Sequence, residues 1–283
     1  MRKLVDCAKR MCTGVRVSEH REAKSILSKI DNNKSNYCAI HYSCQSFYDN
    51  DTGLLPRITS IAVCDLDTWQ AQSFSIHITA ALLKIPFDKI PENYDQVEEV
   101  MLREYFGYLK SNEKLNFVHW NMRDGNFGFK AIELRGQLLC PDAVYVVPNG
   151  QKIDVSRLFI KLYGKKYISH PQFASIIEKN YKLPRYFMDG ESEAKAFDDG
   201  EYVKLHQSTQ VKVSSLSKLL SLAADNDLKT DATWKDTYGL SVDGILTALG
   251  QKWYGKLIFW LFAAIAGGII TYIVTDVIRG SPS

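Results

Sequence analysis

The feature that most constrains this chain is an uncharged stretch near its C-terminus. Residues 257–275 read LIFWLFAAIAGGIITYIVT and contain no charged side chain. About 20 apolar residues in a helix cross the hydrocarbon layer of a bilayer. A helix packed by one face of a soluble domain has a polar face at a spacing of about 3.6 residues, and this stretch has none. We therefore predict a transmembrane helix over residues 256–278, with a fully buried helix in an oligomer core as the alternative.

The residues around this stretch indicate its orientation. Lys252 and Lys256 precede it, whereas Asp276 and Arg279 follow it. Because positive charges concentrate on the cytoplasmic side of a span, the lysines place the large N-terminal part in the cytoplasm. The first residues, MRKLVDCAKRMC, have apolar side chains interrupted by charge, unlike a signal peptide. The expected topology is a single-pass, tail-anchored membrane protein whose lipid partner is the bilayer.

Small residues recur within the predicted span. Ala263 and Gly267 are four residues apart, and so are Ala264 and Gly268. This spacing allows two helices to approach closely, which leaves two alternatives: self-association through the span, or a single span in which small residues are simply common. The membrane residues singled out are Leu257, Trp260, Ala263, Gly267, Gly268 and Ile270.

Composition limits what the rest of the chain can be. The 283 residues are 46% hydrophobic and 24% charged, which is enough apolar material for a core and unlike a disordered chain. A net charge of +3 excludes a highly basic nucleic-acid coat protein. The six cysteines are scattered without a dense framework, which favours reduced thiols in the cytosol.

The chain before the span divides into three regions. Residues 1–35 form a basic, helix-prone segment, which is expected to pack by one apolar face, with anionic lipid or nucleic acid as the alternative contact. Residues 36–225 form the main domain. Residues 226–255 form a linker with a short helix that leads to the membrane.

Within the main domain, hydrophobic periodicity predicts an order of strands and helices. Strands are expected at residues 37–48, 58–64, 71–81, 116–120 and 144–147. Helices are expected at residues 94–111, 125–134, 153–163, 171–180, 192–206 and 215–224, with Ser214 or Ser215 as the cap of the last.

A polar motif follows the strand expected at residues 116–120. His119 and Asn121 come at its end, and Asp124 follows within a few residues, in the sequence FVHWNMRD. Together with the order of elements, this motif resembles the DEDD exonuclease superfamily of the RNase H-like fold. The strand ITSIAV at residues 58–63 resembles the strand that follows the family's first motif.

The resemblance spans residues 36–225 and carries expectations for fold and chemistry. It implies an α/β domain with an RNase H-like mixed sheet flanked by helices. It also implies a nucleic-acid substrate and a pair of Mg²⁺ or Mn²⁺ ions, roughly 4 Å apart around the scissile phosphate, with Asp124 as a metal ligand. The catalytic residues that it implies are Asp124, His119, Asn121, Glu193 and His206.

The chain departs from the family pattern at the acidic positions. The family's first strand has an Asp-x-Glu pair, but here the strand reads CAIHYSC, with His41 and Ser43 at those positions. A neutral imidazole and a hydroxyl are poor ligands for hard cations. The family's last motif, a His or Tyr a few residues before an Asp, has no match of the expected form in residues 189–206. The sequence therefore predicts an incomplete metal site.

Three functions remain after these comparisons. The first is a membrane-anchored cytoplasmic domain that binds or senses nucleic acid or a nucleotide, which by analogy suits a bacterial defence effector. The second is an active membrane-tethered 3'–5' exonuclease that uses Asp124 with Glu191, Glu193 or Asp198. The third is a non-enzymatic membrane adaptor that binds protein.

Other chemistry has little support in the sequence. Cys38 and Cys44 face one side of a strand and His41 faces the other, so they cannot converge on zinc. Residues 124–128 contain two glycines but no Walker lysine, and the chain has no G-x-S-x-G motif. A run of polar and basic residues is expected to be solvated surface, with a phosphate-binding face as the alternative: Lys204, Ser208, Thr209, Lys212, Ser214 and Lys218.

Overall fold

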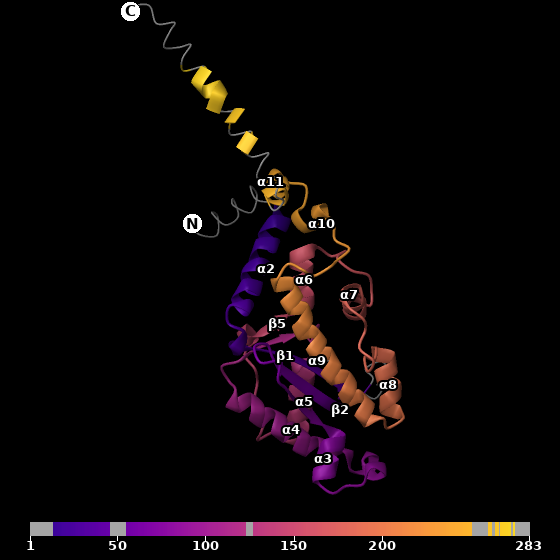
Figure 1. Ribbon diagram of the computed structural model, residues 1–283. Helices are drawn as coiled ribbons and strands as arrows, with labels where there is room; N and C mark the ends of the chain where they lie inside the picture. Colours follow the sequence, from indigo (N-terminus) through magenta and orange to yellow (C-terminus); the bar gives the residue numbers. More distant parts are fainter. Residues whose placement is uncertain are drawn as a thin grey trace, which may run out of the picture.

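The computed structural model describes most of the chain. The described residues are 14–45, 55–122 and 127–250, and in the C-terminal tail 260, 261, 264, 265, 267–272 and 274. Within them the chain forms a five-stranded mixed sheet with helices on both faces (Figure 1). The α/β class and the mixed, helix-flanked sheet expected from the sequence are therefore confirmed.

The sheet has the order β3-β2-β1-β4-β5. The first three strands pair in antiparallel fashion, β4 pairs with β1 in parallel, and β5 pairs with β4 in parallel. The central strand is therefore the first in sequence. The strands are β1 (Tyr37–Cys44), β2 (Ile58–Asp65), β3 (Ala71–Ser75), β4 (Asn116–His119) and β5 (Lys152–Asp154).

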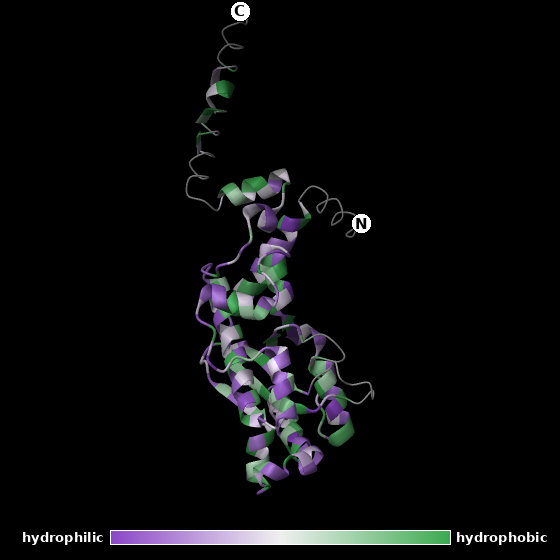
Figure 2. Ribbon diagram, turned by 90° about the vertical axis from the view of Figure 1, so that its right-hand side faces the viewer, coloured by the Kyte–Doolittle hydropathy of each residue, from purple (hydrophilic) through white to green (hydrophobic). Residues whose placement is uncertain are grey.

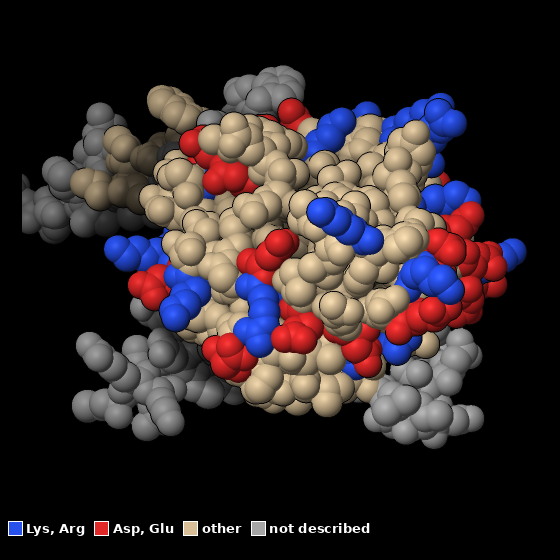
Figure 3. All heavy atoms as spheres, turned by 90° about the horizontal axis from the view of Figure 1, so that it is seen from below, with Lys and Arg blue, Asp and Glu red and all other residues tan. Residues whose placement is uncertain are grey.

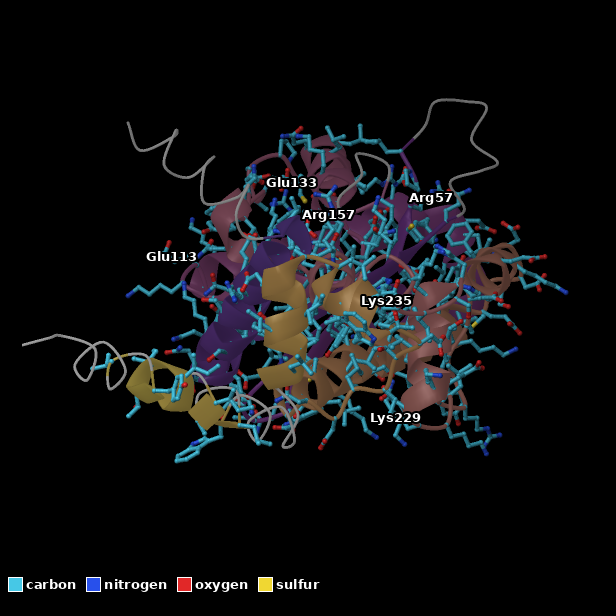
Figure 4. The ribbon with its side chains drawn as sticks, turned by 90° about the horizontal axis from the view of Figure 1, so that it is seen from above. Arg57, Glu113, Glu133, Arg157, Lys229 and Lys235 are labelled. Atoms are coloured by element: carbon cyan, nitrogen blue, oxygen red, sulfur yellow. The ribbon has the colours of Figure 1, made fainter. Side chains whose placement is uncertain are left out.

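The helices cover both faces and the end of the sheet that leads to the tail. Glu133 of α5 and Lys229, which follows α9, lie on opposite sides of the molecule when it is viewed from above (Figure 4). The helices are α2 (Val15–Asp31), α3 (Ile76–Leu82), α4 (Tyr94–Ser111), α5 (Phe129–Leu139), α6 (Val155–Tyr163), α7 (Gln172–Asn180), α8 (Gly190–Asp198), α9 (Tyr202–Ala224), α10 (Trp234–Tyr238) and α11 (Val242–Gly250).

Side-chain alternation along β1 builds two cores. All residues of β1 are buried, and alternate residues of a strand face opposite sides of the sheet. Ile40 and Tyr42 belong to the core under α4 and α5. Ala39 belongs to the core formed with α2, α6, α7 and α9. His41 and Ser43 follow Ala39 at intervals of two, so polar side chains lie on the α9 face where an apolar core would otherwise continue.

The bounds predicted for the helices at residues 192–206 and 215–224 are wrong. The helix predicted at residues 192–206 is interrupted, because α8 ends at Asp198 and α9 begins at Tyr202. Gly200 has a φ of +69°, a left-handed conformation that breaks the helix and suits glycine. The helix α9 then continues through Ser214, which is not a cap. The hydroxyl of Ser214 donates to the Gln210 carbonyl, as in a helix interior.

Two predicted strands also differ from the structure. The strand expected at residues 71–81 ends at Ser75, because Ile76, Thr79 and Ala80 form a buried helical face in α3. Residues 144–147 are described but form no strand. The fifth strand instead lies at β5, just before α6, and Asp154 caps that helix by accepting a hydrogen bond from the Ser156 amide.

The end of the domain at α3 has a surface of largely uncharged residues with charged side chains among them (Figure 3). Figure 3 views this end and shows mainly uncharged residues in the centre, with charged side chains around them. The exposed apolar side chains here are Ile78, Leu82, Leu83 and Phe87.

The predicted span at residues 256–278 lies partly outside the described residues. Leu257 and Ala263 are outside them. Figure 2 shows hydrophobic residues in α11 and in the described parts of the tail. Among the residues that the structure describes, no helix is both long enough and apolar enough to cross a bilayer. The helical parts of the tail that are described include Trp260, Gly267, Gly268 and Ile270.

Candidate functional site

A cluster of hydroxyl groups lies between the sheet and α9, near the end of β1. Ser43 Oγ of β1 and Ser60 Oγ of β2 lie 2.8 and 2.6 Å from Thr209 Oγ1 of α9. Thr209 Oγ1 in turn donates to the Leu205 carbonyl within the helix at 2.9 Å. All three side chains are buried. The cluster therefore joins two neighbouring strands to the helix that covers them.

A buried ion pair adjoins these hydroxyls. Glu193 Oε1 of α8 lies 2.7 Å from Lys212 Nζ of α9, and the two side chains are 12% and 7% exposed. The same carboxylate oxygen accepts hydrogen bonds from Ser43 Oγ at 3.0 Å and Ser208 Oγ at 2.7 Å. Charge-assisted hydrogen bonds of this kind are stronger than neutral ones and offset part of the cost of burial. We call Ser43, Ser60, Glu193, Ser208, Thr209 and Lys212 the Glu193–Lys212 cluster.

The local sequence explains why these side chains meet. On α9, Thr209 follows Ser208 by one residue and Lys212 follows Ser208 by four, which places the three side chains on one face of the helix. Glu193 lies in the first turn of α8, whose start is fixed by Asp189, since this side chain accepts a hydrogen bond from the Ser192 amide at 2.8 Å. α8 packs beside both β1 and α9, so its first turn lies at the end of β1.

His41 lies beside the cluster and is neutral. It is buried, and the rings of Phe127 and Phe173 lie 6.3 Å from it. Burial, and next the positive charge of Lys212 and then His119, lower the pKa of His41 well below its usual range. Its Nδ1 atom has no hydrogen-bond partner among the described residues. The imidazole therefore adds no charge to the site.

These residues do not fit a pair of metal ions. Hard cations prefer carboxylate oxygens, and two-metal sites hold their ions close together. In the Glu193–Lys212 cluster the carboxylate is Glu193, and it is already neutralised by an ammonium group. Among the described residues, no group of three or more His, Cys, Asp or Glu side chains could hold a metal ion. Asp124, the predicted metal ligand, lies outside the described residues.

The other residues predicted from the motif, His119 and Asn121, make contacts at the end of β4. His119 ends β4, is buried, and accepts a hydrogen bond from the Met122 amide at 3.1 Å. Asn121 has a φ of +60°, and its backbone N–H donates to Asp154 Oδ1 at 3.2 Å. The two residues therefore form a turn that links β4 to the start of α6.

His206 lies away from the Glu193–Lys212 cluster. Its Nε2 lies 2.7 Å from Ser73 Oγ of β3, and its ring lies 5.0 Å from that of His77 in α3. Burial, followed by the charge of His77, lowers the pKa of His206 to about 4. Glu191 and Asp198, the other acidic candidates, are exposed on α8. The structure thus brings Glu193 to the end of β1, and it brings neither His206 nor these two carboxylates there.

The expected solvated surface on α9 is only partly present. Ser208, Thr209 and Lys212 are buried, so that expectation is wrong for them, whereas Lys204 and Lys218 are exposed. Their spacing could have revealed this. Thr209 comes four residues after the core residue Leu205, and Lys212 comes four residues before the core residue Leu216. Both are therefore at core positions of an amphipathic helix.

The cysteines that the structure describes are buried and free. Cys38 and Cys44 belong to the core under α4, on the opposite face of β1 from His41. Burial raises the pKa of Cys38 to about 11. These thiols are therefore neither a zinc site nor reactive nucleophiles.

Comparison of the sequence with protein-family models gave no match, and comparison with curated proteins gave none. Function must therefore be inferred from the site and the fold.

Proposed function

We propose that this chain is a membrane-anchored, cytoplasmic RNase H-like domain that binds or senses nucleic acid or a nucleotide without hydrolysing it. The observation that carries this proposal is the Glu193–Lys212 ion pair at the end of β1, which stands where hydrolysis would need carboxylates free to hold metal ions. Attachment to a membrane would couple ligand binding to an effect there, as a bacterial defence effector requires.

The order of the strands supports the RNase H-like part of the proposal. An antiparallel unit of β1, β2 and β3 is followed by two strands added in parallel on the other side of β1. RNase H-like domains have this same order. In exonucleases of this class the end of the first strand carries catalytic carboxylates, and here it carries Ser43.

The charge of the cluster argues against two-metal hydrolysis. A Mg²⁺ or Mn²⁺ ion entering next to Ser43 would face the ammonium of Lys212 in a poorly solvated site, where like charges repel strongly. Lys212 also occupies the oxygen of Glu193 that a metal would need. The protein itself therefore supplies positive charge where the family uses ions.

Membrane attachment rests on the C-terminal tail. The stretch at residues 257–275 is uncharged, and its described helical residues expose apolar side chains such as Ile265, Ile269 and Ile270. Side chains of this kind are stable in contact with lipid or with another copy of the helix. Trp260 is 78% exposed, as expected for an aromatic anchor at the membrane interface.

The function is tested with the full-length chain in non-ionic detergent and end-labelled single-stranded DNA or RNA. We expect binding that weakens as salt rises, and no shortening of the strand with Mg²⁺ or Mn²⁺. Shortening that is abolished by Asp124→Asn would support the exonuclease instead. The absence of both binding and cleavage would leave the protein-binding adaptor.

Anchorage is tested by flotation with liposomes. The full-length chain is expected to float with the vesicles after an alkaline wash, and a chain that ends at residue 255 is expected to stay behind. Equal behaviour of the two chains would contradict the membrane part of the proposal.

A further inference from the structure

A groove runs along the outer face of α9, on the side of the helix away from the Glu193–Lys212 cluster. Its volume is about 330 Å³. Three segments that are distant in sequence form it: the turn between β2 and β3, the chain that follows α7, and α9 itself. Its lining includes Trp69, Tyr181, Gln210, Ser214 and Lys218.

Trp69 forms one wall of the groove and is held there by its turn. The side chain of Asp65 accepts hydrogen bonds from the amides of Asp67 and Thr68 at 2.9 and 2.8 Å. Trp69 itself has a φ of +61°, an unfavourable conformation for a bulky residue. Its side chain is nonetheless 48% exposed. A large aromatic side chain that is strained and left in solvent suggests a role in contacting a ligand.

The opposite wall pairs an aromatic ring with positive charge. Lys218 Nζ lies 3.9 Å from the ring centroid of Tyr181, whose hydroxyl donates to the Ser215 carbonyl. These contacts fix the ring and hold the ammonium over its face, on an exposed residue that lines the groove. Pro184, in the same segment as Tyr181, also lines the groove. This part of the lining therefore joins one aromatic ring to one cation.

The floor supplies polar groups. Ser214 is exposed on α9, and Gln210 donates to Ser73 Oγ at 3.3 Å while it lines the groove. An exposed aromatic ring beside a cation is a combination that binds single-stranded nucleic acid, because a base stacks on the ring and a phosphate contacts the cation. An apolar peptide would not need this charge, and a bare phosphate would not need the exposed indole.

We propose that this groove is the binding site for single-stranded nucleic acid, with a base stacked on Trp69 and a backbone phosphate beside Lys218. The inference rests on the proposed function and places its ligand on the outer face of α9 instead of at the Glu193–Lys212 cluster. Stacking and phosphate contact tolerate any base sequence, so the site discriminates single strands from duplex more than one sequence from another.

The test measures binding of fluorescein-labelled oligothymidylate and oligouridylate to the full-length chain in detergent. Trp69→Asn is expected to weaken binding at least about fivefold through loss of stacking. Asparagine adopts a positive φ readily, so the turn is expected to remain folded. Lys218→Glu is expected to weaken binding and to reduce the slope of log K against log salt concentration by about one.

Matched controls separate the groove from general effects. Trp234→Ala removes another exposed tryptophan, and Lys110→Glu reverses an exposed lysine on α4; both are expected to bind like the wild type. If the wild type binds and Trp69→Asn and Lys218→Glu bind with the same affinity as the wild type, the groove is not the binding site, while the proposed function still stands. A wild-type chain that binds neither oligomer would overturn both. A preference for one oligomer identifies DNA or RNA as the source of the ligand.

Discussion

The two faces of the sheet each contain a buried ion pair, and the two pairs differ in their surroundings. Under α4 and α5, Arg135 Nε and Nη2 contact both carboxylate oxygens of Glu98, with distances of 2.7–3.0 Å. Glu98 also accepts a hydrogen bond from the Ile58 amide, and Arg135 contacts Asp95 as well. This pair is surrounded by partners that tie α4, α5 and β2 together.

Under α9, the Glu193–Lys212 pair has hydroxyls for neighbours and lies at the end of the central strand. A lysine ammonium is a point charge without the planar fork of arginine, so it imposes less geometry on its partner. The comparison indicates that the Glu98–Arg135 pair fixes the fold, whereas the Glu193–Lys212 pair sets the charge of a site.

The largest effect is expected from Arg135→Met. The substitution leaves Glu98 buried without its partner, and breaking a buried pair in this way costs about 3–5 kcal/mol of unfolding free energy. Urea denaturation at pH 7 measures it. Arg103→Met is the matched control, because Arg103 pairs with Asp142 on the surface, where loss of the pair should change stability far less. Equal losses in the two variants would remove the structural role given to Glu98 and Arg135.

A smaller loss is expected from Lys212→Met, about 2–3 kcal/mol, since Glu193 keeps its hydroxyl partners and is partly exposed. The double variant Glu193→Gln with Lys212→Met removes both charges and should recover most of this loss. Urea denaturation of the single and double variants gives the coupling between the two residues. A double variant no more stable than Lys212→Met would show that the site does not depend on charge balance.

The strands and helices with strong periodic patterns could be predicted from the sequence. The bounds of α4 match the prediction because Val97, Met101 and Tyr105 recur at helical spacing. β5 could not be predicted, since it has three half-buried residues and no alternation. It exists because β4 offers it a parallel partner, which is a tertiary effect.

The candidate site was only half visible in the sequence. The resemblance to exonucleases directed attention to Ser43 and Glu193, which the structure places 3.0 Å apart. Lys212 was missed because a lysine in a helix is normally solvated. Lys212 can be buried because α8 brings Glu193 beside it. The position of α8 depends on the break in the helix at Gly200, which is set by the positive φ of that residue.

A third polar residue of α9, His206, makes stability depend on pH, because burial, followed by the charge of His77, lowers its pKa. The pKa of His206 is about 4 in the folded protein and about 6.5 when unfolded, so the unfolded state binds more protons between these values. Stability is therefore fully present above pH 6.5 and is lost as the pH falls, by about 2 kcal/mol at pH 5.

The measurement compares urea denaturation of the wild type and His206→Gln at pH 7 and pH 5. Glutamine can keep the hydrogen bond to Ser73 and does not titrate, so the variant should lose less stability over this range. Because His41 and His77 also have lowered pKa values, part of the pH dependence should remain in the variant. Identical pH dependence in the two proteins would show that His206 titrates normally in the folded state.

The smallest effect is expected if Lys212 occupies the place of a metal ion. Lys212→Asp places a second carboxylate beside Glu193 and removes the ammonium. The variant should then bind Mn²⁺ and gain about 1 kcal/mol of stability at a metal concentration a few times its dissociation constant. Thermal unfolding with Mn²⁺ and with a chelator measures the gain, and the wild type and Lys212→Met should show none. Because stabilisation by a metal requires carboxylates and not merely the loss of a positive charge, an equal gain in Lys212→Met would contradict this account of the site.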